Sequence, residues 1–350
     1  MPQGLTHSTD TFYGIICSGL TDKTSLYFIA TNSSFSECVR KRIAQNIFLH
    51  SFSSSSNTDC TGQPYEGCQF NADHPVLSLS SSTSFLSCTF TLLSSPYSGG
   101  AISFTSGNSL TISDCIFTSC TTSVDFDSWE GGGAVCIKSG SLTVSSSLFI
   151  SCTTVSYAGG IFAHSDCSAA SVSFSTFINC EADHGSGLTT YYGPSSTTLS
   201  NKYISCYAYS VGGGLYHDGN SSDFISLSDS LFTNNKANSD SDTSRGGGAF
   251  EDYRKNAYTS KYSFSFFTGN TAPNGVGNDI SVILTALSGS PITHCFTTTS
   301  TNSFWNNYRY ELGWLPQGDT RSITNLRSIV IVSHCYLNTD NIAYSHRIPL

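Results

Sequence analysis

A motif in two halves recurs along most of this chain and constrains its fold more than any other feature. Each copy opens with closely spaced glycines before apolar residues and ends with an aromatic residue three positions before Cys or Asn. From Phe90 onward the aromatic residue returns after 27, 32, 28, 26, 29 and 35 residues. A period of this size indicates a repeat architecture. The paired halves lie at 99–102 and 117–120, 132–135 and 149–152, 159–162 and 177–180, 185–188 and 203–206, 213–216 and 232–235, and 247–250 and 267–270.

The residues between the two halves indicate strands. Runs such as 109–113 and 141–145 alternate polar and apolar residues, which places the apolar set on one face of a strand. The glycine pairs mark backbone with positive φ, or backbone packed too closely for a Cβ atom. Each unit is therefore expected to hold two or three short strands and no helix. We predict an all-β chain, a single-stranded right-handed parallel β-helix whose coils stack at about 4.8 Å.

Other repeat folds fit the sequence less well. A propeller blade needs about 40 or more residues and four strands, and leucine-rich repeats need a leucine ladder that this chain lacks. Only 11% of the 350 residues are charged and Met1 is the one methionine, so the chain is poor in helix-forming residues. The net charge of −9 argues against a nucleic-acid partner.

The repeat divides the chain into three parts. Residues 1–75 are expected to form an N-terminal cap with irregular first coils, in which 39–46 is the one plausible helix. Residues 76–282 are the β-helix, and residues 283–350 are expected to form a C-terminal cap with one or two further coils. Within that last part, 297–315 is expected to pack across the end of the core.

These residues resemble a known repeat family. Gly-Gly-Ala-Ile paired with Phe-x-x-Asn is similar to the repeats of polymorphic outer membrane proteins, and similar repeats occur in surface proteins of parasitic protists. The closest matches are 99–102, 132–135 and 247–250 for the first half, and 232–235 and 267–270 for the second. The resemblance implies a pectate-lyase-like β-helical stalk used in adhesion. Four copies carry Cys where the family has Asn, and the chain shows neither a leader nor a transporter barrel.

Those four cysteines predict a ladder. Cys120, Cys152, Cys180 and Cys206 occupy one position of successive coils, which Asn235 and Asn270 continue. We expect buried thiols packing as small hydrophobic groups beside a stack of the preceding aromatic rings. Disulfides between coils are the alternative, since the coil spacing lies within the usual Cα range. Cys60 and Cys68 bracket a short loop and suggest a local disulfide, whereas no spacing typical of a zinc site is present.

A polar column follows the glycine motif and supplies the weak catalytic candidates. His217, Asp218, Glu251 and Asp252, with His164 and Tyr191 earlier in the column, are expected to lie near one another on one face of the coils. One interpretation is a carboxylate and imidazole cleft for glycan cleavage. The other is a solvated edge with no catalytic role, which we favour because no basic residue lies nearby to complete a lyase site.

These patterns predict a non-enzymatic surface or secreted protein that acts in adhesion or interaction with a host or cell surface. The alternative is a carbohydrate-active β-helix, a polysaccharide lyase or glycoside hydrolase. The expected partner is a cell-surface protein or glycan along the lateral face, bound by a monomer without cofactor, metal or nucleic acid. No signal peptide or membrane span is visible, so surface exposure would require a longer exported protein.

Overall fold

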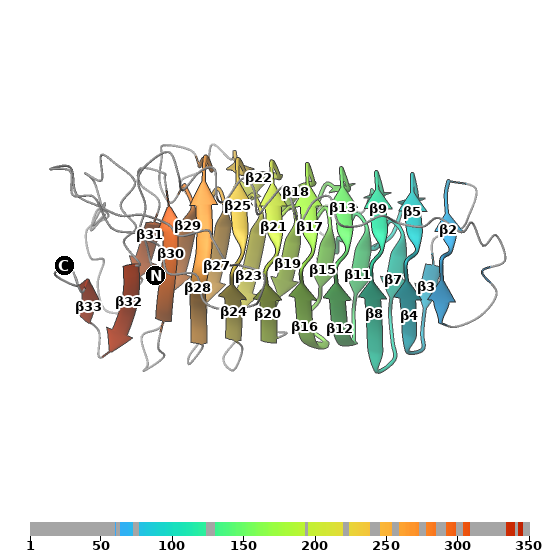
Figure 1. Ribbon diagram of the computed structural model, residues 1–350, viewed down its shortest axis with the longest axis horizontal. Helices are drawn as coiled ribbons and strands as arrows, with labels where there is room; N and C mark the ends of the chain where they lie inside the picture. The colour runs from blue at the N-terminus through green and yellow to red at the C-terminus, as the bar shows by residue number, and fades with distance from the viewer. Residues whose placement is uncertain are drawn as a thin grey trace, which may run out of the picture. The chain divides into compact units, whose positions relative to one another are not determined.

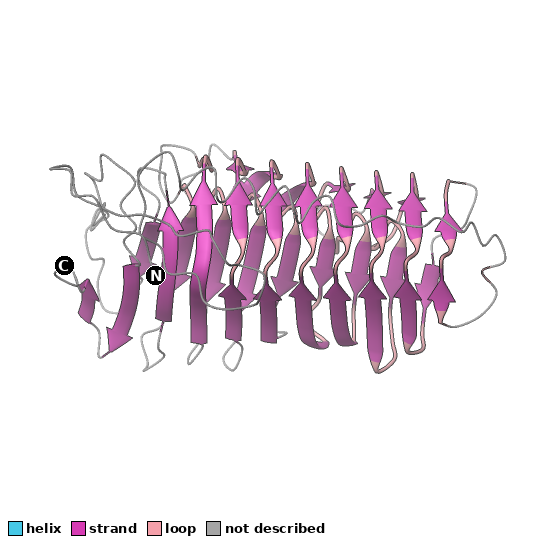
Figure 2. Ribbon diagram, in the orientation of Figure 1, coloured by secondary structure: helices cyan, strands magenta, loops and turns pink. Residues whose placement is uncertain are grey.

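The computed structural model shows an all-β chain that winds into a parallel β-solenoid (Figure 1). Helix is absent from the residues that it describes (Figure 2). All of them belong to one compact unit, Ser55–Asn325 with Ser333–Leu350. The described residues are 60, 64–72, 77–123, 130–192, 195–219, 224–238, 246–253, 259–272, 278–284, 292–298, 304–308, 334–339 and 342–345.

Six turns of the solenoid carry four strands each. The turns are numbered one to six in chain order, and each visits three sheets. The first strand of each turn lies in a nine-stranded sheet, here the glycine-side sheet, because it follows the glycine motif. Its members are β3 (Leu77–Leu79), β7 (Ile102–Phe104), β11 (Val135–Ile137), β15 (Ile161–Ala163), β19 (Leu188–Tyr191), β23 (Leu215–Gly219), β27 (Ala249–Tyr253), β29 (Ile280–Leu284) and β31 (Phe304–Tyr308).

The second and third strands of each turn lie in an 18-stranded sheet, here the large sheet. The second strands form one column: β4 (Thr83–Leu86), β8 (Ser109–Ser113), β12 (Gly140–Ser145), β16 (Cys167–Ser173), β20 (Ser195–Leu199) and β24 (Phe224–Ser228). The third strands carry the repeated aromatic residue: β5 (Thr89–Thr91), β9 (Ile116–Thr118), β13 (Leu148–Ile150), β17 (Thr176–Ile178), β21 (Lys202–Ile204) and β25 (Leu231–Thr233).

The remaining strands complete the sheets and extend them at both ends. The fourth strands form a six-stranded sheet: β6 (Ser94–Ser95), β10 (Thr121–Thr122), β14 (Thr153–Thr154), β18 (Glu181–His184), β22 (Tyr207–Val211) and β26 (Lys236–Ala237). The large sheet also contains β1 (Tyr65–Glu66), β2 (Gln69–Phe70), β28 (Thr259–Thr268), β30 (Ile292–Thr298), β32 (His334–Thr339) and β33 (Ile342–Ser345).

Each full turn therefore has four strands, where the sequence led us to expect two or three. The extra division arises at two corners whose residues have positive φ although they are not glycine, such as Asp114 before β9 and Ser119 after it. This backbone conformation is uncommon for residues with a Cβ atom and turns the chain sharply. It recurs at equivalent positions of the other turns, for example at Ser146 and Ser151.

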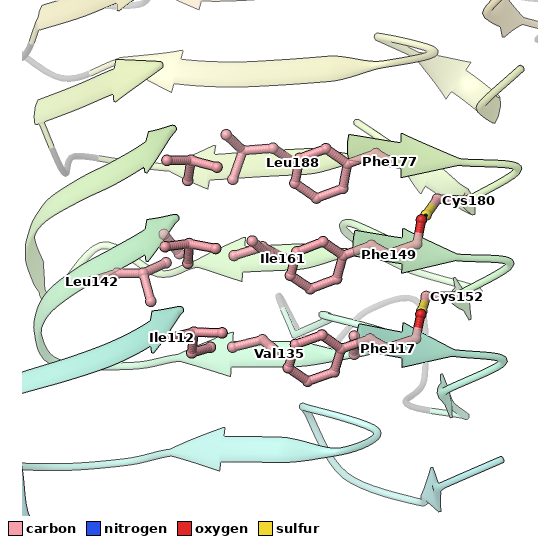
Figure 3. Close-up of a cluster of buried hydrophobic side chains, with 14 of the residues drawn as sticks. Ile112, Phe117, Val135, Leu142, Phe149, Cys152, Ile161, Phe177, Cys180 and Leu188 are labelled. Carbon is pink, nitrogen blue, oxygen red and sulfur yellow. The ribbon is translucent and has the colours of Figure 1, made fainter. Parts of the chain in front are cut away.

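The interior of the solenoid is filled by apolar side chains in register. Phe117, Phe149 and Phe177 extend toward the glycine-side sheet, where they meet Val135, Ile161 and Leu188 (Figure 3). Their rings belong to one stack with centroid separations of 4.5 to 5.0 Å, which confirms the predicted aromatic column. The whole stack is Phe70, Phe90, Phe117, Phe149, Phe177, Tyr203, Phe232 and Phe267.

Close packing explains the repeated glycines. A Cβ atom on Gly160 would lie 2.3 Å from the Gly187 carbonyl oxygen of the next turn and 2.8 Å from Cδ1 of Phe177. Gly132 has a φ of +76°, a conformation that side chains disfavour. The motif therefore lets the backbone of one turn lie against both the next turn and the aromatic stack.

The ends of the solenoid differ in part from the expectation. Strand β31, within the segment predicted to cap the core, instead pairs in parallel with β29 and continues the glycine-side sheet. Strand β32 pairs antiparallel with β30 and ends the parallel stacking of the large sheet. Strand β1 already pairs in parallel with β4. The predicted helix at 39–46 lies outside the described residues.

Candidate functional site

The four catalytic candidates lie on two neighbouring strands of the glycine-side sheet. Strands β23 and β27 pair in parallel, with His217 opposite Glu251 and Asp218 opposite Asp252. Successive residues of a strand point to opposite faces of its sheet. Leu215 of the same strand packs in the main core, so His217 shares its inward face, and Asp218 points outward. The sheet thus brings the candidates together as two pairs on opposite faces, not as one cluster on a single face as predicted.

The inward pair lies inside the solenoid. His217 and Glu251 have no exposed surface, and His217 Nδ1 forms a hydrogen bond with Thr190 Oγ1 from the preceding turn. Burial lowers the pKa of His217 to about 3, because desolvation disfavours the charged imidazolium. His217 is therefore neutral at physiological pH.

The outward pair lies beside an aromatic cluster on the other face of the sheet. Tyr216 and Phe250 stack with centroids 5.6 Å apart, and the Tyr216 hydroxyl donates to Asp218 Oδ2 at 3.3 Å. We call this group the outer aromatic cluster: Cys136, Tyr157, Ala158, Phe162, Tyr191, Val211, Tyr216 and Phe250, all buried. Asp252 is 7% exposed and Asp218 is fully buried.

Burial limits the chemistry that these candidates support. A polysaccharide must contact the carboxylates that cleave it, and none of the four side chains is more than 7% exposed. Within the described ranges, no three His, Cys, Asp or Glu side chains are grouped so as to hold a metal ion. That part of the chain also has no helix of the length and hydrophobicity needed to cross a membrane.

The predicted cysteine ladder is present at the corner between the large sheet and the six-stranded sheet. Cys120, Cys152, Cys180 and Cys206 are free thiols, each at most 1% exposed, and Figure 3 shows two of them beside the stacked rings. Burial, followed by hydrogen bonding to the thiols of Cys152 and Cys206, raises the pKa of Cys180 well above its usual value. The structure therefore agrees with the prediction of buried thiols in the ladder. The predicted local disulfide between Cys60 and Cys68 is also present.

Cysteine and asparagine make equivalent contacts along this ladder. Asn235 Nδ2 donates to the Tyr203 carbonyl oxygen of the preceding turn at 2.9 Å, and Asn270 Nδ2 donates to that of Phe232 at 3.1 Å. The Cys206 thiol lies 3.6 Å from the equivalent Phe177 carbonyl oxygen, within the range for a weak S–H donor. Cysteine can therefore replace asparagine because both supply an inward donor at this corner.

Sequence reasoning missed a second ladder at the corner between β8 and β9 and its equivalents. The backbone N–H of each member donates to the side chain of the next, for example from Ser175 to Asn201 Oδ1 at 2.9 Å. The members are Cys88, Cys115, Ser147, Ser175, Asn201, Ser230 and Ser265. The available signal was a Cys, Ser or Asn two residues before each aromatic residue, which is easily overlooked in a serine-rich chain.

The outer side of the large sheet carries in-register hydroxyl groups. One column contains Thr111, Thr143, Ser171, Thr197 and Ser226, each paired with the next across adjacent turns. Strands β8, β12, β16, β20 and β24 contain no charged residue. The hydroxyl face is defined as the outward residues of the first four: Ser109, Thr111, Ser113, Ser141, Thr143, Ser145, Ala169, Ser171, Ser173, Ser195, Thr197 and Leu199, all half-buried or exposed.

Comparison of the chain with protein-family models, curated proteins and solved structures found no match.

Proposed function

We propose that this protein is a non-enzymatic surface or secreted β-helix whose hydroxyl face binds a cell-surface glycan or protein. The observation that carries the proposal is the uncharged hydroxyl array on the large sheet, which repeats once per turn. Hydroxyl groups both donate and accept hydrogen bonds, so such an array suits a neutral partner with repeated polar groups.

The strands beside the hydroxyl face add apolar contact area. Ile150, Ile178 and Ile204 pair in register on the outer side of the third strands and are half-buried. A surface that combines hydroxyl groups with aliphatic side chains can contact both the polar and the apolar faces of a sugar ring. The resemblance of the Gly-Gly-Ala-Ile and Phe-x-x-Asn halves to polymorphic outer membrane protein repeats also supports a role at a surface.

Binding of the purified chain to intact cells and to a glycan array tests this proposal. We expect the wild-type chain to bind, and we expect Thr143→Arg and Thr197→Arg to lose binding. Each substitution places a large, charged side chain at an exposed position of the hydroxyl face. Val155→Arg is the matched control, since Val155 is 56% exposed and follows β14 in the six-stranded sheet. Absence of binding together with turnover of a polysaccharide would overturn the proposal in favour of the carbohydrate-active alternative.

A further inference from the structure

One turn of the solenoid differs from its neighbours in the chemistry of its interior. In the fifth turn, Ser196 and Thr198 of β20 and Tyr203 of β21 point inward and have no exposed surface. The adjacent turns carry apolar residues at every one of these positions. Ser196 pairs with Ala170 and Ile225, Thr198 pairs with Val172 and Leu227, and Tyr203 stacks with Phe177 and Phe232.

The three hydroxyl groups have no hydrogen-bond partner among the described residues. This holds for Ser196 Oγ, Thr198 Oγ1 and the Tyr203 hydroxyl oxygen, all of which are inaccessible to bulk solvent. A buried hydroxyl group left without a partner is destabilising, because it has given up its hydrogen bonds to water without replacing them. Buried polar side chains therefore bond almost always to protein or to ordered water.

The fourth turn has small interior side chains next to this layer. Ala170 lies where the third turn has Leu142, and Ala163 lies where that turn has Ile137, so the fourth turn has several fewer interior carbon atoms. Ala163 pairs in turn with Thr190 of the fifth turn. Buried hydroxyl groups without protein partners, next to small side chains, favour a site that holds water.

We propose that ordered water molecules bind inside the solenoid at the fifth turn, held by the hydroxyl groups of Ser196, Thr198 and Tyr203. Each hydroxyl group can donate one hydrogen bond and accept others, so shared waters satisfy all three. The hydrogen-bonded pair Thr190 and His217 lines the facing strands of the glycine-side sheet and makes this part of the interior polar.

Water fits this site better than an ion. The three hydroxyl groups are neutral, and a buried charge requires a charged partner to offset its desolvation. The nearest inward carboxyl group on the facing sheet is that of Glu251 in β27. Glu251 lies opposite His217 of β23, and His217 lies opposite Thr190 of β19, so Glu251 is two turns from Thr190. A bound cation is therefore the outcome that would contradict the proposal most directly.

The triple variant Ser196→Ala, Thr198→Val and Tyr203→Phe tests the proposal with residues that the chain itself uses. These substitutions give the fifth turn the interior of the fourth, namely Ala170, Val172 and Phe177. In a high-resolution crystal structure of the full chain we expect solvent density at hydrogen-bond distance, about 2.5–3.0 Å, from the hydroxyl oxygens. The triple variant should lose that density and keep the same backbone.

Water relaxation dispersion in solution gives an independent measurement. The wild-type chain should show at least one more long-lived water molecule than the triple variant, and Thr143→Val on the hydroxyl face should match the wild type. If the triple variant does not fold, Tyr203→Phe alone is the test variant, because the residues stacked on Tyr203 in both neighbouring turns are Phe. Equal counts in wild type and variants, direct protein partners for all three hydroxyl groups, or density that a heavier monovalent cation replaces would overturn the proposal.

Discussion

Replacement of Asn235 by Ala should destabilise the solenoid more than replacement of any of the four cysteines in the same ladder by Ala. Asn235 Oδ1 accepts from the Cys206 backbone N–H at 2.9 Å, and its Nδ2 donates to the Tyr203 carbonyl oxygen at 2.9 Å. Asn235→Ala leaves both buried backbone groups without these bonds. At about 1–3 kcal/mol for each unsatisfied group, the free energy of unfolding should fall by roughly 2–6 kcal/mol.

The matched variant is Asn235→Cys, which installs the residue found at this position in the preceding four turns. A thiol can donate to the Tyr203 carbonyl oxygen as Cys206 does to that of Phe177, so about half of the lost stability should return. Urea unfolding under reducing conditions, followed by circular dichroism, measures the free energies, and hydrogen exchange at the Cys206 amide reports the local bond. A loss below about 1 kcal/mol in Asn235→Ala, or no recovery in Asn235→Cys, would refute the hydrogen-bonding role.

Three further predictions follow from the interior. Phe149→Ala should lower the free energy of unfolding in urea by about 3–5 kcal/mol, because it removes a ring stacked on both sides. Cys152→Ala should lower it by about 1 kcal/mol, because it removes only a small group. Equal losses in the two variants would contradict the aromatic stack. His217 should make the fold sensitive to acid, because burial lowers its pKa to about 3 in the folded chain. The contribution of the neutral His217 to the free energy of unfolding is fully present above about pH 6.5 and falls by about 1.4 kcal/mol per pH unit as the pH drops toward 3. His217→Gln should remove that slope, and an unchanged pH profile would show that His217 is not buried as the neutral form. Gly160→Ala should abolish folding, because the added Cβ atom would lie 2.3 Å from a backbone oxygen. Loss of soluble protein and of the β-sheet circular dichroism signal measures this effect, and a stable variant would refute the close packing of turns.

The repeat predicted the fold because its two halves mark positions where packing allows few alternatives. The glycines lie where backbones of successive turns touch, and the aromatic residues form a single stack. The number of strands in a turn was harder to predict. The corners depend on a left-handed conformation at residues such as Asp114 and Ser146, which have no distinctive side chain in a serine-rich chain.

The polar column shows where sequence reasoning stopped too early. Once 215–219 is taken as a strand, neighbouring residues must alternate between its faces, so His217 and Asp218 cannot share one. The sequence could therefore have separated the two pairs. It could not show that the outward face is also buried, because the outer aromatic cluster around Tyr216 and Phe250 forms only when distant turns stack.

The hydrogen bonds of the cysteine ladder also bear on whether the protein resides in a reducing or an oxidising compartment. Cys152 lies 3.7 Å from the Phe117 carbonyl oxygen, and Cys180 lies 3.8 Å from that of Phe149, so each thiol can donate to the preceding turn. A disulfide between two such residues would remove both S–H donors and leave buried carbonyl groups without them. Oxidation would thus oppose the same contacts that let cysteine replace asparagine, and the folded chain protects these thiols by burial as well. The cysteine content is for this reason compatible with a reducing or an oxidising compartment.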